Sequence, residues 1–324
     1  FAVSAPLVMA SKFAAALLGG ALIGTAAGLR YLLNGRILGI SGICGGLIRG
    51  KAGPSWRATF TSGLLLGGFI LRWQLPSAFY PLPGTFPVAK AVAGGALVGA
   101  GSTLGSGCTS GHGIMGLSRL SIRSLAYVCT FMAAGAVTAT GLGSATATRN
   151  NLNAGPDYAA ALELGAKALA GALVASCSIL LHAMVFDKLR GVLALVVELG
   201  TGVLFALGLG VSGMLSPLAV ASFLDLLNWD PALMLVMGGG IGIALPIIQL
   251  FVNPRITQGK RPLVNTDKFD VVRNRTIDAQ LIAGAVLFGM GWGMSGMCPG
   301  PGLVSLCTPE GAGPILWYVA AMTA

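Results

Sequence analysis

The sequence predicts an all-α integral membrane protein. Of its 324 residues, 55% are hydrophobic and 9% are charged, and the mean hydropathy is +0.82; soluble domains carry about 25% charged residues. The apolar residues form long continuous runs, whereas membrane β-barrels use alternating segments of about ten residues. The 50 glycines fit the same class, because glycine lets membrane helices approach closely. A helical bundle is therefore expected.

We expect about nine transmembrane helices, because a helix that rises about 1.5 Å per residue needs roughly 20 apolar residues to cross a bilayer core. Since the sequence starts at Phe1 and stops inside an apolar run, we expect it to be a fragment whose last span is cut short. The expected spans are 12–33, 58–73, 88–104, 125–142, 159–186, 192–209, 234–251, 277–292 and 314–324.

Small residues recur at helical spacing in several of these spans. Glycines at 20, 24 and 28, at 63 and 67, and at 95 and 99 are separated by three residues. This spacing places them on one face of a helix, where another helix can pack against the backbone. The pattern predicts close helix packing and carries no chemistry of its own.

Glycine-rich breaks follow four of the spans and repeat in order. Gly-Ile-Ser-Gly-Ile at 39–43 matches Gly-Val-Ser-Gly-Met at 210–214, and the stretch around Cys108 resembles that around Cys298. Paired breaks in two halves indicate the substrate site of a transporter, since irregular backbone inside a membrane must be buried or line a cavity. We expect one transmembrane domain, 1–324, with short re-entrant helices and two pseudo-symmetric halves in an inverted repeat, about 12–145 and 158–324. The polar segment 144–157 would separate them.

Cys108 and Cys298 are the leading site candidates, because they repeat in equivalent breaks. Cys44 fits a pathway role and plain packing equally well. The remaining cysteines are expected to be structural, since a free cysteine often packs as a small hydrophobic residue. Cysteine spacing gives no metal signature and no close pair, so no metal or cofactor is expected. The other candidates beside the path are Ser41, Ser110, His112 and Ser295.

Charged residues give weaker indications. Arg119 and Arg123 share a helical face if one helix runs through both; they would attract an anion or extend to lipid headgroups. Glu198, deep in an apolar run, is either functional or the structural partner of an arginine. The basic loop 253–275 is expected to face the cytoplasm. The net charge of +10 favours anionic lipid or solutes, and no nucleic-acid motif is present.

A cysteine with a pKa of about 8.5 is mainly protonated at neutral pH. Its S–H group is a weak hydrogen-bond donor. Such a group suits a soft anion with a terminal sulfur, and it binds weakly enough to release the ion, as conduction requires. A thiolate would repel the same anion.

Residues 105–124 resemble the signature of the YeeE/YedE sulphur-transport family, and 39–43, 228–231 and 296–302 are similar to that family's other blocks in the same order. The resemblance implies a multi-pass protein of the plasma or inner membrane that imports thiosulfate through an hourglass-shaped fold, without enzymatic activity. It also implies cysteines that relay the ion by S–H···S contacts at the constriction. Cys108 and Cys298 match two of them, and the third position falls to Ser41 or Cys44.

Three alternatives remain open at this stage. The substrate could be a selenium compound, as for some members of that family. The protein could be a membrane thiol oxidoreductase or persulfide carrier, although the absence of a C-x-x-C motif disfavours this. It could also deliver sulfur to a soluble sulfur-carrier protein, which the transport interpretation accommodates.

Overall fold

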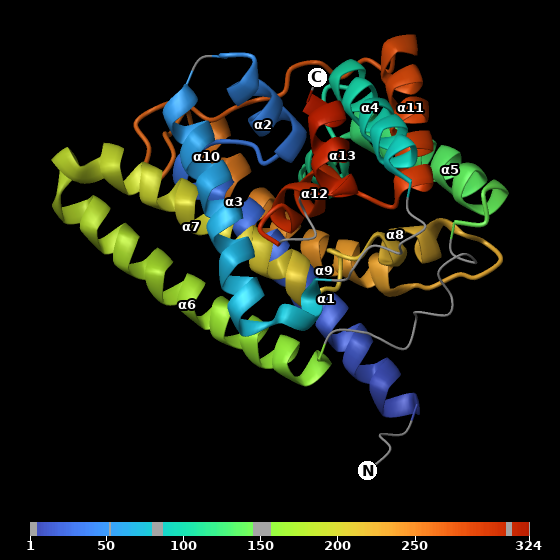
Figure 1. The fold of residues 1–324 in the computed structure, drawn as a ribbon. Coiled ribbons are helices and arrows are strands. Elements are labelled where there is room, and N and C mark those ends of the chain that lie inside the picture. The colour runs from blue at the N-terminus through green and yellow to red at the C-terminus, as the bar shows by residue number, and fades with distance from the viewer. Residues whose placement is uncertain (1–4, 52, 80–86, 145–156, 309–312, 324) are drawn as a thin grey trace.

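The computed structural model describes residues 5–51, 53–79, 87–144, 157–308 and 313–323. Within these residues every regular element is a helix, which confirms the all-α prediction. Figure 1 shows long helices that cross around short ones near the centre of the molecule, with α6 along one flank beside α7. The segment 145–156, most of the expected boundary between halves, lies outside the described residues.

Long helices form the outer frame of the fold. They are α1 (Ala5–Asn34), α3 (Pro54–Gln74), α4 (Val88–Leu104), α5 (Ile122–Gly141), α6 (Tyr158–Val185), α7 (Arg190–Val211), α9 (Ala232–Pro246), α11 (Ala279–Ser295) and α13 (Pro314–Thr323). A π-helical stretch, η5 (Ile247–Val252), and α10 (Asn253–Thr257) extend α9. Short 3-10 turns, η1 (Pro76–Ala78) and η4 (Asp187–Leu189), follow α3 and α6.

Five of the described helices are long and apolar enough to cross a membrane, or up to seven spans if two bent helix pairs each count as one. The chain is therefore a multi-pass membrane protein. The expected number of about nine is reached only by adding α3 and α13. The first carries more polar side chains along its length, and the second has 10 residues. That number therefore stays a prediction.

A short helix follows each of the four glycine-rich breaks. These helices are α2 (Ile40–Ile48), η2 (Thr109–Gly116, π-helical), α8 (Pro217–Leu224) and α12 (Pro299–Ser305). The chain bends by 48° between α4 and η2 and by 40° between α11 and α12. The breaks thus end long helices inside the bundle and start short ones, as expected for broken or re-entrant segments.

The glycine spacings mark close contacts between α1–α5 and the helices that follow α5. A Cβ atom added at Gly20 or Gly24 of α1 would lie 2.2 Å from a carbonyl oxygen of α9. A Cβ at Gly63 of α3 would lie 2.2 Å from a carbonyl of α7, and one at Gly95 of α4 2.3 Å from a carbonyl of α13. The prediction of glycine-mediated packing is confirmed, and the two sets of helices share one core.

Replacing Gly24 by valine is expected to destabilise the bundle strongly. Its side chain would overlap the backbone of Gly240, and overpacking a filled interface costs about 3 kcal/mol or more when backbones must move. Gly242→Val on α9 is the matched control, because nothing lies within 4 Å of its added Cβ. The unfolding midpoint in detergent should fall for Gly24→Val alone. Equal midpoints for the two variants would contradict this packing.

A buried ion pair joins α1 to α7. The Nε atom of Arg30 lies 2.6 Å from a carboxylate oxygen of Glu198, and both side chains are fully buried. Arg36 and Asn34 also donate to this carboxylate, at 3.3 and 2.9 Å. Arg30 donates a further hydrogen bond, of 2.8 Å, to the carbonyl of Ile37. Glu198 is thus the partner of an arginine, one of its two predicted roles, and this pair fixes the turn that leads into α2.

The loop after α10 crosses the same turn. The N–H of Asp270 donates to the carbonyl of Gly35 at 2.7 Å, and the Tyr31 hydroxyl donates to the carbonyl of Asp270 at 2.8 Å. Burial raises the pKa of the Asp270 carboxyl, although the N–H of Ile37 and nearby arginines act in the opposite direction. This loop therefore holds the first break in place.

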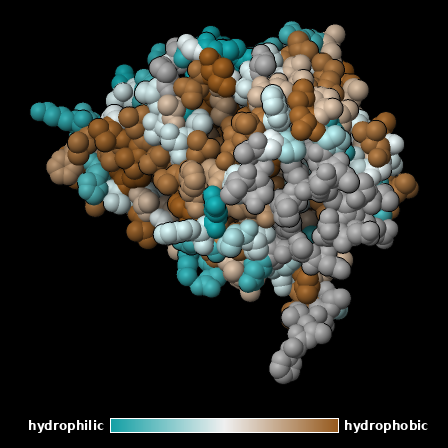
Figure 2. Space-filling model, in the orientation of Figure 1, coloured by the Kyte–Doolittle hydropathy of each residue, from teal (hydrophilic) through white to brown (hydrophobic). Residues whose placement is uncertain are grey.

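Exposed apolar side chains mark the surface that contacts lipid. Apolar residues cover much of the face in Figure 2. On α6 only 6% of an apolar stretch of 18 residues is buried inside the protein, and Val174 and Met184 are 71% and 83% exposed. Such a helix is stable in a bilayer, where apolar side chains need no protein cover.

Candidate functional site

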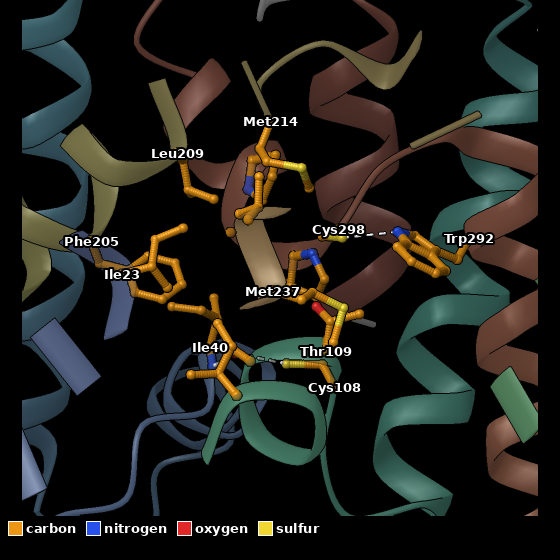
Figure 3. Close-up of a pocket in the computed structure, with 16 residues that line it drawn as sticks. Ile23, Ile40, Cys108, Thr109, Phe205, Leu209, Met214, Met237, Trp292 and Cys298 are labelled. Atoms are coloured by element: carbon orange, nitrogen blue, oxygen red, sulfur yellow. Dashed lines mark hydrogen bonds between the residues drawn. The ribbon is translucent and has the colours of Figure 1, made fainter. Parts of the chain in front are cut away.

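A small cavity of about 60 Å³ lies where the breaks converge (Figure 3). It brings Cys108, from the break before η2, together with Cys298, from the break before α12. Thr109, Ser110 and Trp292 supply further polar groups. Most of the remaining wall is apolar or carries thioether sulfur: Ile23, Ile40, Ile114, Phe205, Leu209, Met214, Val236 and Met237.

Backbone geometry places both cysteines at this wall. Each is the N-cap residue of the short helix that follows it, in extended conformation, with φ −126° at Cys108 and −98° at Cys298. The turn before Cys298 depends on Gly296, where φ is +67° and a Cβ would lie 2.2 Å from the carbonyl oxygen of Pro217. Only glycine fits that position without strain. The glycine-rich motifs thus deliver the thiols to the cavity.

Each thiol has a neutral hydrogen-bond partner. The indole Nε1 of Trp292 donates to the sulfur of Cys298 at 2.9 Å, and the sulfur of Cys108 lies 3.3 Å from the hydroxyl of Ser110. The same hydroxyl oxygen accepts the N–H of Ile40 at 3.2 Å. Ser110 was a candidate from the sequence, whereas Trp292 was missed. An isolated tryptophan in a run of glycines, six residues before Cys298, is the signal that could have identified it.

The first break contributes Ile40 to the cavity wall, while Ser41 and Cys44 do not line it. Both lie on α2, with Ser41 half-buried and Cys44 buried. The sulfur of Cys44 lies 3.7 Å from the Thr61 hydroxyl of α3. The assignment of a third pathway position to Ser41 or Cys44 stays a prediction.

His112 and Ser295 brace the bends behind the cavity wall. The two ring nitrogens of His112 each lie 3.0 Å from an oxygen, one of the Ser124 hydroxyl and one of the Gly105 carbonyl. Its ring stacks on Tyr127 with centroids 4.2 Å apart. The Ser295 hydroxyl donates to a carbonyl of α11 at 2.7 Å. Neither residue lines the cavity.

Arg119 and Arg123 do not share a helical face, because the condition for it, one helix running through both, is not met. The helix ends at Ser118, Leu120 has a φ of +56°, and α5 starts anew behind its N-cap, Ser121. Arg119 donates to the carbonyl of Met115 at 3.1 Å, and Arg123 donates to the carbonyl of Thr276 at 2.9 Å. These bonds tie them to separate elements outside the cavity wall.

The other cysteines lie away from the cavity. Cys307 donates to the carbonyl of Leu65 at 3.2 Å, and Cys129 and Cys177 are exposed on α5 and α6. All six cysteines are free thiols. Among the described residues, no three His, Cys, Asp or Glu side chains are grouped so that they could hold a metal ion.

Broken membrane helices around a small central cavity define the class of membrane transport proteins. Comparison with known proteins agrees: a "probable transporter" of Xylella fastidiosa strain 9a5c is 40% identical over 139 residues, which are 90% of that protein and 42% of this chain. Two from strain Temecula1 are also 40% identical, each over 130 residues, 82% and 93% of their lengths and 40% and 39% of this chain. The chain belongs to the family of these transporters.

The family of unknown function DUF6691 matches residues 193–324. No solved structure matches the chain. Each of the three relatives is about half as long as this chain: the matches cover 82–93% of each relative but only 39–42% of this chain. Their name implies transport and not catalysis.

Proposed function

We propose that the protein takes up thiosulfate, or a closely related small anion with a terminal sulfur, through the constriction lined by Cys108 and Cys298. The observation that carries the proposal is the meeting of these two thiols, from breaks 190 residues apart in the chain, at one small cavity. Protonated thiols donate weak hydrogen bonds to an anion. Weak contacts at two points favour both entry and release.

The size and lining of the cavity favour a soft anion. A volume of about 60 Å³ has room for a few water molecules, so an ion that enters exchanges part of its hydration for contacts with the wall. That loss is costly for charge concentrated on oxygen. A terminal sulfur is larger and more polarisable, and the thioethers of Met214 and Met237 offer it matching contacts. Sulfate lacks this soft end.

The hydrogen-bond partners of the thiols favour transport over covalent chemistry. A reactive cysteine needs a nearby cation or a resolving thiol. The hydrogen-bond partners of Cys108 and Cys298 are the neutral side chains of Ser110 and Trp292. A selenium analogue of the same shape has similar soft chemistry and is the second candidate substrate.

We infer the finer architecture from the same features. The repeated order of breaks and the half-length relatives support two pseudo-symmetric halves, about 12–145 and 158–324. Location in the plasma or inner membrane, about nine spans and transfer to a soluble sulfur-carrier protein complete the proposal. Arg119 and Arg123, the second of which bonds to Thr276 beside the basic loop, would attract anions by their charge.

Uptake of labelled thiosulfate by cells that lack their own importers tests this function. Cells that make the protein should accumulate label, and cells with an empty vector should not. Unlabelled thiosulfate should compete, whereas sulfate at the same excess should not, and a selenium analogue should compete in proportion to its affinity. Accumulation equal to that of the empty vector would overturn the thiosulfate assignment. Competition by sulfate would overturn the role of the soft cavity.

A further inference from the structure

Each cavity thiol lies within hydrogen-bond distance of a neighbouring polar side chain. We propose that Trp292 and Ser110 are positioning residues that make the sulfurs of Cys298 and Cys108 hydrogen-bond acceptors, so that both S–H protons are directed to the substrate. The inference rests on the proposed function for its purpose, namely anion binding. Its geometric basis is the pair of contacts from Trp292 and Ser110 (Figure 3).

The direction of the bond at Cys298 is fixed by chemistry. An indole N–H can only donate a hydrogen bond, so the sulfur 2.9 Å away must accept it. The indole is 1% exposed and packs edge-on against Phe131, with ring centroids 5.3 Å apart and an interplanar angle of 80°. It is therefore held against the sulfur. One lone pair of Cys298 is therefore occupied by the indole N–H.

The backbone favours the same direction at Cys108. The N–H of Ile40 is also a donor only, so it occupies one acceptor site of the Ser110 oxygen, 3.2 Å away. The hydroxyl proton of Ser110 can then donate to the sulfur of Cys108, at 3.3 Å. In the arrangement that we propose, a chain of donors runs from the start of α2 to the thiol, and each bond polarises the next.

The Thr109 hydroxyl lines the same cavity as the Cys298 thiol. An entering anion is a stronger hydrogen-bond acceptor than a neutral hydroxyl, so the S–H group donates to the anion. Without Trp292 and Ser110, the sulfurs could turn lone pairs toward the anion and repel it.

The pH profile of thiol alkylation tests the positioning role directly. Alkylation requires the thiolate, and an N–H or O–H donor to the sulfur favours that form. In the purified protein, Trp292→Phe should raise the pH of half-maximal alkylation at Cys298 by about one unit and leave Cys108 unchanged. Ser110→Ala should do the reverse. Trp317→Phe, which changes a tryptophan that is 54% exposed on α13, should shift neither profile.

Two further variants separate lost bonds from lost packing. Site-specific replacement of Trp292 by benzothienylalanine keeps the ring shape and removes the N–H, and should shift Cys298 as Trp292→Phe does. Ser110→Thr keeps the hydroxyl and should restore the profile of Cys108. Unshifted profiles in the benzothienylalanine protein and in Ser110→Ala would overturn the inference. A shift of both cysteines in every variant would also overturn it, because a general structural change would then be the cause.

Transport provides the second readout. The half-saturating thiosulfate concentration should rise about three- to tenfold in Trp292→Phe and Ser110→Ala, with the protein still in the membrane. The alkylation profiles need no substrate, so they decide the positioning role even if thiosulfate is not transported. Unaltered half-saturation in both variants, beside a parent that transports thiosulfate, would overturn the inference and leave the proposed function intact.

Discussion

Replacing Glu198 by alanine is expected to remove most of the folded protein. The change leaves the Arg30 guanidinium fully buried between α1 and α7 without its carboxylate, and breaking a buried pair on one side costs about 3–5 kcal/mol. Rings of Trp56 and Phe60, with centroids 5.2 and 5.0 Å from the guanidinium carbon, offset only part of this cost. The yield of monodisperse protein and its unfolding midpoint in detergent would both fall.

Two comparisons make this prediction specific. Glu163→Ala removes an exposed carboxylate that pairs with Lys167, and such surface pairs contribute little to stability. Its midpoint should match that of the parent. The double variant Arg30→Met with Glu198→Met removes both charges and should recover much of the lost stability. A Glu198→Ala protein as stable as Glu163→Ala would contradict a structural role for the pair.

Alanine at Cys298 or at Cys108 is expected to lower thiosulfate uptake about tenfold or more, while the protein stays in the membrane. Each change deletes one S–H donor to an anion, and a hydrogen bond to a charged group is worth about 1.5–3 kcal/mol. Serine at either position should keep part of the activity, because it retains a donor of similar size. Initial rates, normalised to protein in the membrane fraction, measure the effect.

Cys129→Ala is the matched control for these variants, because Cys129 is an exposed thiol on α5 outside the cavity. Its uptake should equal that of the parent. If Cys108→Ala and Cys298→Ala also transport at the parental rate, the thiol-lined path is refuted even though transport itself stands.

Much of the framework follows from local sequence. Composition predicted a membrane environment and the helical class. Glycines separated by three residues correctly indicated the faces of α1, α3 and α4 that pack against other backbones. The glycine-rich motifs also predicted the bends, because glycine is the residue that most readily adopts a positive φ, as Gly296 does. The prominence of Cys108 and Cys298 followed from repetition of these motifs.

Contacts between residues far apart in the chain could not be predicted from local sequence. Arg30 and Glu198 are separated by 168 residues, and no local pattern identifies a partner at that distance. The condition for a shared helical face of Arg119 and Arg123 is not met, because Leu120 adopts a left-handed conformation that is uncommon for leucine and could not be predicted from its residue type. Trp292 was not predicted, because its indole N–H is a single donor within an apolar helix. The bend after α11 brings its acceptor, the sulfur of Cys298, into reach.

Protection of thiols by substrate tests the central claim most directly. Site-resolved alkylation of the purified protein should slow at both Cys108 and Cys298 when thiosulfate is present at saturation, since both sulfurs line one cavity. Cys129 and Cys177, exposed on α5 and α6, should react at unchanged rates. Equal rates at both cavity cysteines with and without thiosulfate would contradict a shared binding path.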